Sequence, residues 1–539
     1  MALELGRKKI LIIDDFADMR STLKRMLQAF NGKDIDVAAN GREALSLLGR
    51  KAYDIVLCDY NLGEGKDGQQ VLEEAKHREL IRYSSIFIMI TAENTMEMVM
   101  GAVEYKPDDY LTKPFNKDLL GSRLEKLLEK KGDLAEIERA AQKREYHHAI
   151  KLCDERIGQR PRNISELYKL KGELCVAAGQ FEEAAKVYEK VLSVRSVPWA
   201  MLGLGKVRYL TGNYLGARDI FQELTQEHKA FVEAYDWLAK TMEELGDLSE
   251  AQAVLNIAAD MSPKAILRQK ALGDIAIKNQ DFEAAERALR KAVRLGRESV
   301  YKDASHYTKL AKALSSTGQG QEALKVLHGA RKEFVDDKEA GLQASIAEGM
   351  VFKSLGREIE AAKAFEEAAK AYDGVAGKVS SEVTLDMARA AFMLGDKDKG
   401  MAIMQGVVRN HHEDDKVLRE AQKAFDELNM GDEGREIISS TKAEVVQLNN
   451  QGVRLVKEGR LEEAITFFED AVKAMGGNKT VNLNAAQVML MYMQKNGKND
   501  RYLYQVRQFL DRVAKIDPAN GAFQKLSAIY EKMIENEPA

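Results

Sequence analysis

The sequence predicts an α/β, doubly wound domain with a five-stranded parallel sheet over residues 1–128, followed by an all-α array of paired helices. The two regions of the chain differ in their pattern of apolar residues and prolines, and this difference indicates the division. Over residues 7–125, short β-branched apolar runs alternate with helical segments, as in a parallel sheet with helices on both faces. After about residue 130 the strand pattern stops, and no proline falls between Pro263 and Pro518. A proline-free stretch rich in Ala, Leu, Glu and Lys favours helix throughout.

Polar side chains close four of the apolar runs in the first domain. The runs and the residues that close them are 10–13 with Asp14 and Asp15, 54–58 with Asp59, 86–90 with Thr91, and 110–112 with Lys113. In an open parallel sheet the carboxyl ends of the strands form one rim, and ligand sites lie at that rim. We therefore expect these side chains to lie close together.

Length, charge and cysteine content bound the class of protein. With 539 residues the chain is expected to hold three or four domains, or one domain and an array. The net charge is −4, so no overall positive charge favours a nucleic-acid-binding protein. No apolar stretch reaches the ~18 residues that a membrane-spanning helix needs, so no membrane span is expected. Cys58, Cys153 and Cys175 are scattered without metal-ligand spacing, as in reduced cytosolic proteins. The N-terminus lacks the order of a signal peptide, so a cytoplasmic protein is expected.

Small residues recur through the helical part at nearly constant spacing. Ala149, Ala184, Ala217, Ala251 and Ala285 lie 35, 33, 34 and 34 residues apart, and Ala323, Ala361 and Gly400 continue the series before a gap of 64 residues to Ala464. A second small residue precedes most of them by twelve positions, and this set is Gly172, Gly205, Ala239, Gly273, Ala311, Gly349, Ala388 and Gly452. Between the two small residues lies a glycine in most units, and this set is Gly179, Gly212, Gly246, Gly318, Gly356, Gly395 and Gly459.

This spacing predicts a stack of helix pairs. Two antiparallel helices approach closely only where side chains are small, and a glycine ends the first helix by taking a positive φ. Each pair must then stack on its neighbours to bury its remaining apolar face. The pattern resembles the tetratricopeptide repeat over about residues 135–535. The resemblance implies a superhelix that presents a surface to a protein partner.

The repeats are expected to divide the helical part into regions. Regular repeats are expected over 136–400, and further repeats with a capping helix over 446–539. Residues 401–445 are expected to be a degenerate helical region in which Gly431 marks at most a weak unit. Residues 129–135 are expected to be a short linker or a direct continuation of the last helix of the first domain.

The carboxylates of the first domain indicate a metal-assisted reaction. Asp14, Asp15 and Asp59 at one rim repel one another unless a cation lies among them, and oxygen ligands with room for water suit Mg²⁺. Such an ion offsets the charge of an incoming phosphoryl group and leaves Asp59 available as the nucleophile. Lys113 can neutralise one phosphoryl oxygen and Thr91 can donate to another. The alternative interpretation is an acidic surface cluster without chemistry.

The motifs around this rim resemble the receiver domain of bacterial response regulators, of the chemotaxis type, over about residues 8–128. The segments that stand in family order are Ile13–Phe16, Leu57–Asn61, Thr91–Glu93 and Tyr110–Phe115. The resemblance implies a flavodoxin-like fold in which Asp59 is the phosphoacceptor. It further implies that Asp15, Asp59 and the main-chain carbonyl of Asn61 bind Mg²⁺, with Asp14 assisting through water.

Further roles follow from the same resemblance. Thr91 and Tyr110 correspond to the switch pair of the family, and Lys113 to the lysine that bridges to the phosphorylated aspartate. Asn61 and Glu93 correspond to the two positions that tune hydrolysis of the phosphoaspartate.

The loop after Asp59 departs from the family pattern. It lacks the usual proline and carries Gly63 and Gly65, which predicts a more mobile loop. Together with Gly68 these glycines match the spacing of a dinucleotide-binding loop. We do not favour that interpretation, because Asp59 and Glu64 would oppose a pyrophosphate and the fingerprint belongs to the first strand of such a domain.

These features together predict an adaptor gated by phosphorylation rather than an enzyme. A sensor histidine kinase or a phosphotransfer protein would phosphorylate Asp59, the face formed by residues 94–128 would change shape, and the array would bind its protein partner differently. One alternative is a constitutive scaffold whose receiver is a docking module or phosphate sink. Another is an enzyme within residues 400–450, although His411 and His412 are expected on a solvated face. The oligomeric state is not predicted.

Overall fold

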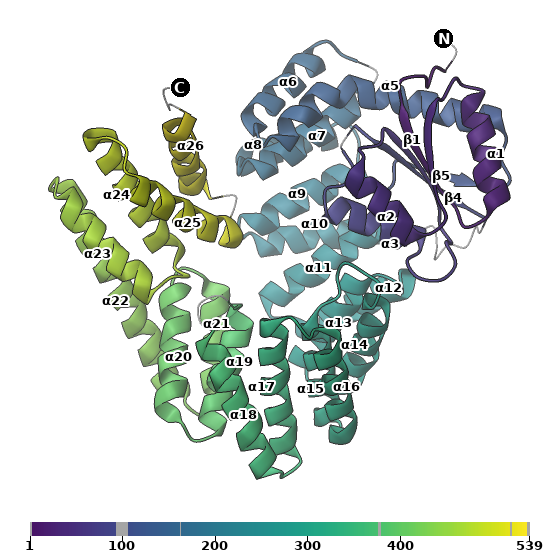
Figure 1. Ribbon diagram of the computed structural model, residues 1–539. Helices are drawn as coiled ribbons and strands as arrows, with labels where there is room; N and C mark the ends of the chain where they lie inside the picture. Colours follow the sequence, from purple (N-terminus) through teal and green to yellow (C-terminus); the bar gives the residue numbers. More distant parts are fainter. Residues whose placement is uncertain are drawn as a thin grey trace. The chain divides into compact units, whose positions relative to one another are not determined.

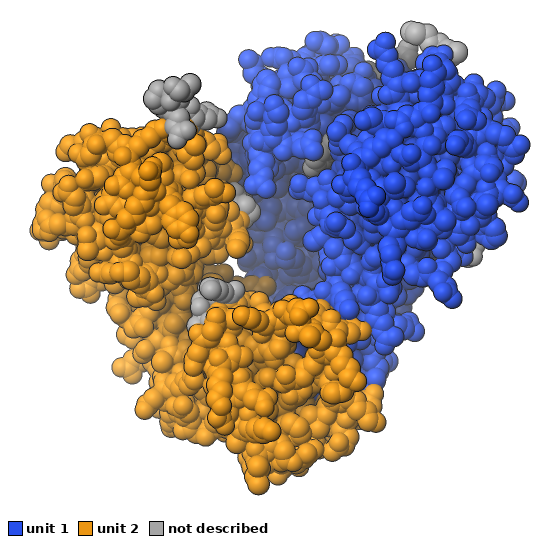
Figure 2. Space-filling view, in the orientation of Figure 1, with its two compact units in different colours: residues 1–313 blue, residues 314–539 orange. Residues whose placement is uncertain are grey.

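The computed structural model of the chain describes residues 3–82, 84–92, 106–161, 163–375, 379–517 and 520–535. The chain forms two compact units, residues 1–313 and residues 314–539 (Figure 2). Within the described residues, no helix combines the length and the apolar character needed to cross a bilayer.

A five-stranded, all-parallel sheet begins the first unit, as predicted (Figure 1). Its strands are β1 (Lys9–Ile13), β2 (Asp34–Ala38), β3 (Ile55–Asp59), β4 (Ile86–Thr91) and β5 (Asp109–Thr112). The strand order is β2-β1-β3-β4-β5, which places β3 at the centre with β1 and β4 as its neighbours. β3 is buried along its whole length because both faces of the sheet are covered by helices.

Among the described residues, four helices cover the two faces of the sheet. They are α1 (Ala17–Gln28), α2 (Gly41–Arg50), α3 (Gly68–His77) and α5 (Lys117–Gln142). Leucines of α1 and α5 share one apolar core with the sheet, whereas α2 and α3 share the core on its other face. This packing fixes the carboxyl ends of β1, β3, β4 and β5 at one rim.

Paired helices make up the rest of the chain (Figure 1). In the first unit they are α6 (Tyr146–Gly158), α7 (Ile164–Ala177), α8 (Phe181–Leu192), α9 (Pro198–Leu210), α10 (Tyr214–Glu227), α11 (Val232–Leu245), α12 (Leu248–Met261), α13 (Ile266–Lys278) and α14 (Phe282–Gly296). The division between the units falls within α15 (Ala304–Ser316). In the second unit they are α16 (Gly320–Glu333), α17 (Lys338–Ser354), α18 (Glu358–Asp373), α19 (Ser381–Met393), α20 (Lys397–Asn410), α21 (Asp415–Glu427), α22 (Gly431–Lys457), α23 (Leu461–Ala474), α24 (Lys479–Asn496), α25 (Asp500–Ile516) and α26 (Gly521–Glu535).

The small residues lie where the helices of a pair approach most closely, as the spacing predicts. A Cβ atom added to Gly205 on α9 would lie 2.4 Å from the ring of Phe221 on α10. The corresponding distances are 2.5 Å from Gly172 to Tyr188 and 2.4 Å from Gly452 to Phe468. All seven predicted turn glycines have a positive φ, between 70° and 88°. The repeat pattern therefore reflects two requirements, close contact between helices and a left-handed turn.

Residues 401–445 contain a regular helix pair that the sequence pattern hides. Asn429 takes the left-handed turn with φ 59°, and Gly434 approaches Phe425, so that a Cβ on Gly434 would lie 2.6 Å from the Phe425 side chain. Gly434 lies 34 residues after Gly400 and 30 before Ala464, so the gap of 64 residues holds one unit. The expectation that Gly431 marks this unit was wrong. In this unit Gln422 occupies the position twelve residues before Gly434, where other units have a small residue. Asn429 occupies the turn position in place of glycine, because asparagine tolerates a positive φ.

In each of two long helices, the two halves pack against different neighbouring elements. α22 has 27 residues, and its first half pairs with α21 while its second half carries Gly452 against α23. α5 has 26 residues, begins in the sheet domain with Leu120 and Leu124, and ends with Leu134 and Ile137 in the first core of the array. Residues 129–135 are therefore helical, and one helix joins the two parts of the first unit.

We predict opposite effects for two glycine substitutions in helices of the first unit. Gly205→Ala should lower the free energy of unfolding by about 1–3 kcal/mol, because the new methyl group overlaps Phe221. Gly132→Ala should raise it by about 0.5–1 kcal/mol, because Gly132 lies inside α5 with open space at its Cβ position. Urea unfolding followed by the fluorescence of Trp199 and Trp237 measures both effects. Equal effects of the two substitutions would contradict the close helix crossing.

Candidate functional site

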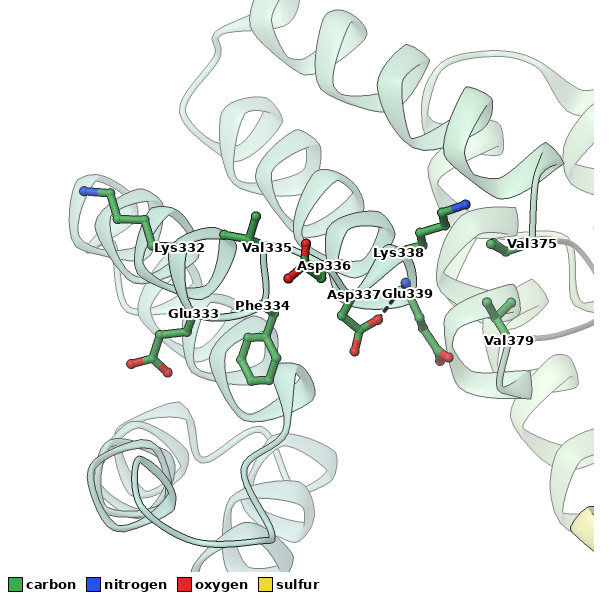
Figure 3. Close-up of a pocket in the computed structure, with 10 residues that line it drawn as sticks. All are labelled: Lys332, Glu333, Phe334, Val335, Asp336, Asp337, Lys338, Glu339, Val375 and Val379. Carbon is green, nitrogen blue, oxygen red and sulfur yellow. Dashed lines mark hydrogen bonds between the residues drawn. The ribbon is translucent and has the colours of Figure 1, made fainter. Parts of the chain in front are cut away.

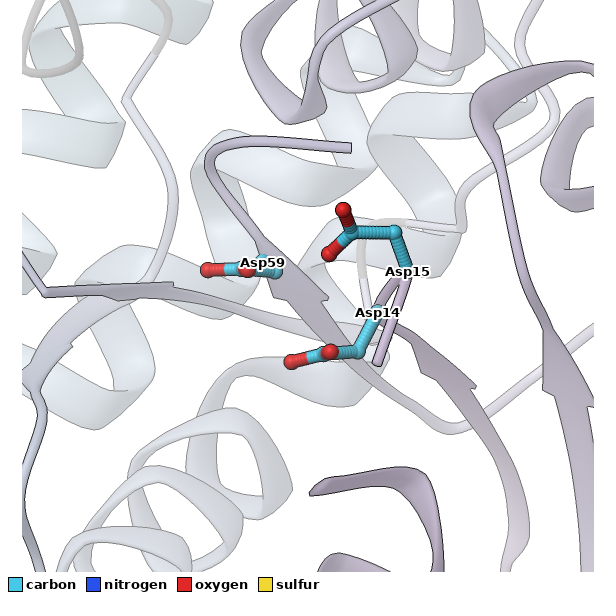
Figure 4. A group of neighbouring side chains, drawn as sticks. All are labelled: Asp14, Asp15 and Asp59. Carbon is cyan, nitrogen blue, oxygen red and sulfur yellow. The ribbon is translucent and has the colours of Figure 1, made fainter. Parts of the chain in front are cut away.

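Three carboxylates converge at the rim of the sheet (Figure 4). Asp14 and Asp15 follow β1, and Asp59 is the last residue of β3, the neighbouring strand. Carboxylate oxygens of the three residues lie within 4.8 Å of one another. Asp14 is fully buried and Asp59 is 6% exposed, so their charges are not solvated and require partners in the protein.

Lys113 provides part of that compensation. It follows β5, and its Nζ lies 3.0 Å from Asp14 Oδ2 and 3.1 Å from Asp59 Oδ2. Burial alone would lower the pKa of Lys113, but the hydrogen bond to Asp14 and the charge of Asp59 outweigh burial, so this pKa is raised. Lys113 is therefore a cation held between the two buried carboxylates.

Burial governs the protonation of Asp59. It raises the pKa of this carboxyl to about 6 against the opposing effect of Lys113, and the negative charge of Asp14 raises it further. Asp59 is therefore ionised at neutral pH but holds its charge in a poorly solvated place. An ionised, weakly solvated carboxylate is suited to act as a nucleophile.

Main-chain contacts hold the acidic pair in place. The backbone N–H of Phe16 donates to Asp14 Oδ1 at 2.8 Å. Arg20 on α1 donates from Nη1 to the carbonyl oxygens of Asp14 and Asp15, at 2.7 and 3.0 Å. Arg20 could not be predicted from the sequence, because it contacts main-chain oxygens from one turn inside a helix.

The other predicted residues that the structure describes lie on β4 and β5 and in the loop after β3. Thr91 ends β4, and its carbonyl accepts the backbone N–H of Lys113 at 2.7 Å. Tyr110 lies on β5 with its hydroxyl buried, and burial raises the pKa of that hydroxyl. Asn61 lies just beyond Asp59, and its side chain accepts the backbone N–H of Gly63 at 3.3 Å. Glu93 lies outside the described residues.

The glycine loop serves the aspartate site rather than a nucleotide. A Cβ on Gly68 would lie 2.1 Å from the carbonyl oxygen of Asp59, so only glycine fits at the start of α3. Gly63 and Gly65 both have a positive φ. Asp67 caps α3, with its side chain accepting the backbone N–H of Gln70 at 2.8 Å. The loop is thus shaped to bring α3 against the end of β3.

The carboxylate set fits a hard divalent cation. All its ligand atoms are oxygens, and among the described residues Asp15 Oδ1 is a buried oxygen without a hydrogen-bond partner. A buried carboxylate oxygen of this kind is an available ligand, and oxygen ligands of this type suit Mg²⁺. The donor set therefore agrees with the predicted magnesium site.

His412 in the array has a structural role. His412 is 5% exposed, contrary to the expected solvated face. Its Nδ1 lies 2.9 Å from Nδ2 of Asn478, which also donates to the carbonyl of Arg409 at 2.6 Å. These contacts tie the connection after α20 to the connection after α23. Together with the continuous helix pairs in this segment, they argue against an enzymatic site there.

A hollow of about 860 Å³ lies at the connection between α16 and α17 (Figure 3). Its lining residues are Lys332, Glu333, Phe334, Val335, Asp336, Asp337, Lys338, Glu339, Val375 and Val379. The charges are of mixed sign, and Asp337 accepts the backbone N–H of Glu339 at 2.9 Å as the cap of α17. Asp337 thus serves the start of α17, and we assign no ligand to this hollow.

Comparison with known proteins identifies the two parts of the chain. Residues 10–125 match the family model of the response regulator receiver domain. Residues 170–230, 238–298 and 270–336 match the model of the tetratricopeptide repeat.

Individual relatives resemble about a quarter of the chain. The chemotaxis protein CheY-3 of Vibrio cholerae is 32% identical over 122 residues, which are 23% of this chain and 92% of that protein. The chemotaxis protein CheY of Pseudomonas aeruginosa is 30% identical over 122 residues, which are 23% of this chain and 97% of that protein. Among solved structures, the chemotaxis protein CheY4 of Vibrio cholerae is 25% identical with a TM-score of 0.21, and covers 22% of this chain and 98% of its own.

We predict that Asp59→Asn stabilises the metal-free chain in a pH-dependent way. Because the pKa of Asp59 is about 6 in the folded chain and ordinarily 3.8, ionising this carboxyl costs folding free energy as the pH rises from about 4 through 6. The variant should be more stable than the wild type by about 1–3 kcal/mol at pH 7.5, and the difference should shrink as the pH falls toward 4. Scanning calorimetry in a chelating buffer measures this. The exposed Asp118→Asn is the control, and a pH-independent difference would contradict the burial of the charge.

Proposed function

Since this chain belongs to the response regulators, with a chemotaxis-type receiver domain followed by tetratricopeptide repeats, we propose that phosphorylation of Asp59 controls the binding of a protein partner by the repeats. Receiver domains accept signals in two-component systems, and tetratricopeptide repeats suggest a protein-binding output. Neither part is a typical enzymatic output domain.

The observation that supports this proposal most strongly is the position of Lys113 between Asp14 and Asp59. A lysine at 3.1 Å from the Asp59 carboxylate is placed to contact oxygens of a phosphoryl group added there. Asp15 and Asp59 would hold Mg²⁺, with Asp14 beside them and, by resemblance to the family, the Asn61 carbonyl as a further ligand. A bound Mg²⁺ would offset the charge of the transferred group.

The proposed reaction transfers a phosphoryl group from a phosphohistidine of a sensor kinase or phosphotransfer protein. An ionised oxygen of Asp59 attacks phosphorus, the P–N bond breaks, and an acyl phosphate forms. The released imidazole keeps the electrons of the broken bond and takes up a proton. Thr91 and Tyr110, on the adjacent strands β4 and β5, are the proposed switch pair, and Asn61 and Glu93 are proposed to tune hydrolysis.

The structure offers a direct route from the receiver to the repeats. Lys113 lies between β5 and α5, and α5 continues into the first core of the array. Lys131 on the array half of α5 forms an ion pair at 3.0 Å with Asp108, which precedes β5. A displacement of β5 or α5 would therefore move residues that belong to the array.

We predict that a small phosphodonor labels the full chain at Asp59. Acetyl phosphate with Mg²⁺ should add one phosphoryl group to the wild type and none to Asp59→Asn, and chelation of the metal should abolish labelling. Lys113→Ala should slow labelling about 100-fold, because the developing phosphoryl charge loses its cation. Intact-mass spectrometry measures this, with Asp118→Asn as the control. Equal labelling of wild type and Asp59→Asn would refute the assignment of the phosphoacceptor.

Partner capture distinguishes gating from a constitutive scaffold. With gating, wild-type chain treated with beryllofluoride and Mg²⁺ should capture a partner from cell extract to a different extent than untreated chain, and Asp59→Asn should show no such difference. A partner captured equally under all conditions would instead support the scaffold.

A further inference from the structure

The receiver touches the array at a second place, far from α5 in sequence. On the array side the contacts come from Glu233 at the start of α11 and from two connections that lead from one helix pair to the next, namely residues 262–265 between α12 and α13 and 297–303 between α14 and α15. Successive connections of this kind lie along one edge of a repeat array. All residues in the contact belong to the first compact unit.

Helix α3 supplies the centre of the contact. Glu73 is 3% exposed and Ser299 is 7% exposed, and Ser299 Oγ donates to Glu73 Oε2 at 2.9 Å. One turn further along α3, the ring of His77 meets the edge of Tyr301 with centroids 5.6 Å apart. A carboxylate on the surface helix of an isolated receiver would be solvated. Here it is buried and hydrogen-bonded by the array, which indicates a specific contact.

The segment that follows Asp59 supplies a second part of the contact. Lys264 Nζ lies 3.3 Å from the hydroxyl of Tyr60 and 5.3 Å from the centre of its ring. Lys66, at the end of the glycine loop, donates to the carbonyl oxygen of Glu298 and forms an ion pair with Glu74 at 3.0 Å. Tyr60 is the residue after Asp59, so the array contacts the phosphoacceptor strand almost directly.

An ion pair completes the contact at its other end. Lys106, before β5, lies 2.9 Å from Glu233 Oε2 at the start of α11. Glu233 Oε1 also pairs with Lys206 of α9 at 2.6 Å. Burial alone would raise the pKa of Glu233, but the two lysines outweigh burial and lower it. One carboxylate thus joins a receiver lysine and an array lysine.

We propose that the α3 face of the receiver, formed by Tyr60, Lys66, Glu73, His77 and Lys106, docks in cis on this edge of the array, and that phosphorylation of Asp59 releases it. The inference rests on the proposed function for its trigger, whereas the docking itself rests on the contacts above. The partner of the α3 face is the chain's own repeats. Release would free the edge residues Glu233, Lys264 and Ser299 for another protein.

Geometry links docking to Asp59. Gly68 at the start of α3 packs on the carbonyl of Asp59, and Gly68 N–H donates to the carbonyl of Tyr60 at 2.8 Å. A change in the loop therefore moves the helix and the ring that meet the array.

Zero-length cross-linking with a carbodiimide tests docking on the full chain. The reagent joins the ammonium and carboxylate of an ion pair, and mass spectrometry of peptides then reports Lys106–Glu233 and Lys206–Glu233 separately. The second link lies within the array and is the internal control. For the untreated chain we expect both links. Absence of Lys106–Glu233 with Lys206–Glu233 present would overturn the docking, whether or not Asp59 accepts a phosphoryl group.

Beryllofluoride with Mg²⁺, added before the reagent, tests the release. With the mimic bound, as shown by fluorine NMR, we expect the Lys106–Glu233 yield to fall about tenfold relative to Lys206–Glu233, a shift of about 1.4 kcal/mol. In Asp59→Asn the ratio should not change. An unchanged or higher ratio in the wild type with bound mimic would overturn the release.

A substitution at the contact separates docking from phosphorylation. Ser299→Glu places a second carboxylate against the buried Glu73 and should lower the Lys106–Glu233 yield without any mimic. The matched control is Ser193→Glu, at the exposed end of α8 in an earlier connection between repeats. Equal yields in the two variants would overturn the assignment of Ser299 and Glu73 to the docking surface.

Discussion

The shared helix α5 is the constraint on which the first unit depends. Its leading half packs Leu120 and Leu124 into the core under the sheet, and its trailing half packs Leu134 and Ile137 into the first core of the array. A helix of 26 residues is about 39 Å long and moves as a body. The receiver therefore has no free linker on which to turn, and any shift of α5 relative to the sheet must be accommodated at both ends. The α3 contact adds a second point of attachment, so receiver and repeats are coupled through two routes.

The chemistry of the rim depends on how little water reaches it. Asp14 and Asp59 are buried with one cation, Lys113, between them, and burial raises the pKa of Asp59 to about 6. Such a site gains from any ligand that brings positive charge among its carboxylates. The same segment that ends in Asp59 continues into Tyr60, which the array contacts. Asp59, which carries charge at the rim, and Tyr60, which contacts the array, are therefore adjacent residues.

Much of this organisation is local in the sequence and was predictable for that reason. Four strands of the receiver, β1, β3, β4 and β5, carry functional side chains at or just after their ends, and most helix pairs carry their small residues and turn glycine within one period. Where another residue takes a structural role, the pattern fails, as at Gln422 and Asn429. Contacts between distant segments leave no local signal. Lys264 and Tyr60 are 204 residues apart, and nothing in either segment indicates that they meet.

Hydrogen exchange of the full chain, with and without beryllofluoride and Mg²⁺, tests most directly whether the receiver controls the repeats. The account predicts that bound mimic slows exchange in residues 59–68 and speeds exchange in the connections at 262–265 and 297–303, where docking is lost. Asp59→Asn should show neither change. Altered exchange confined to the receiver, with both array connections unchanged, would contradict the account.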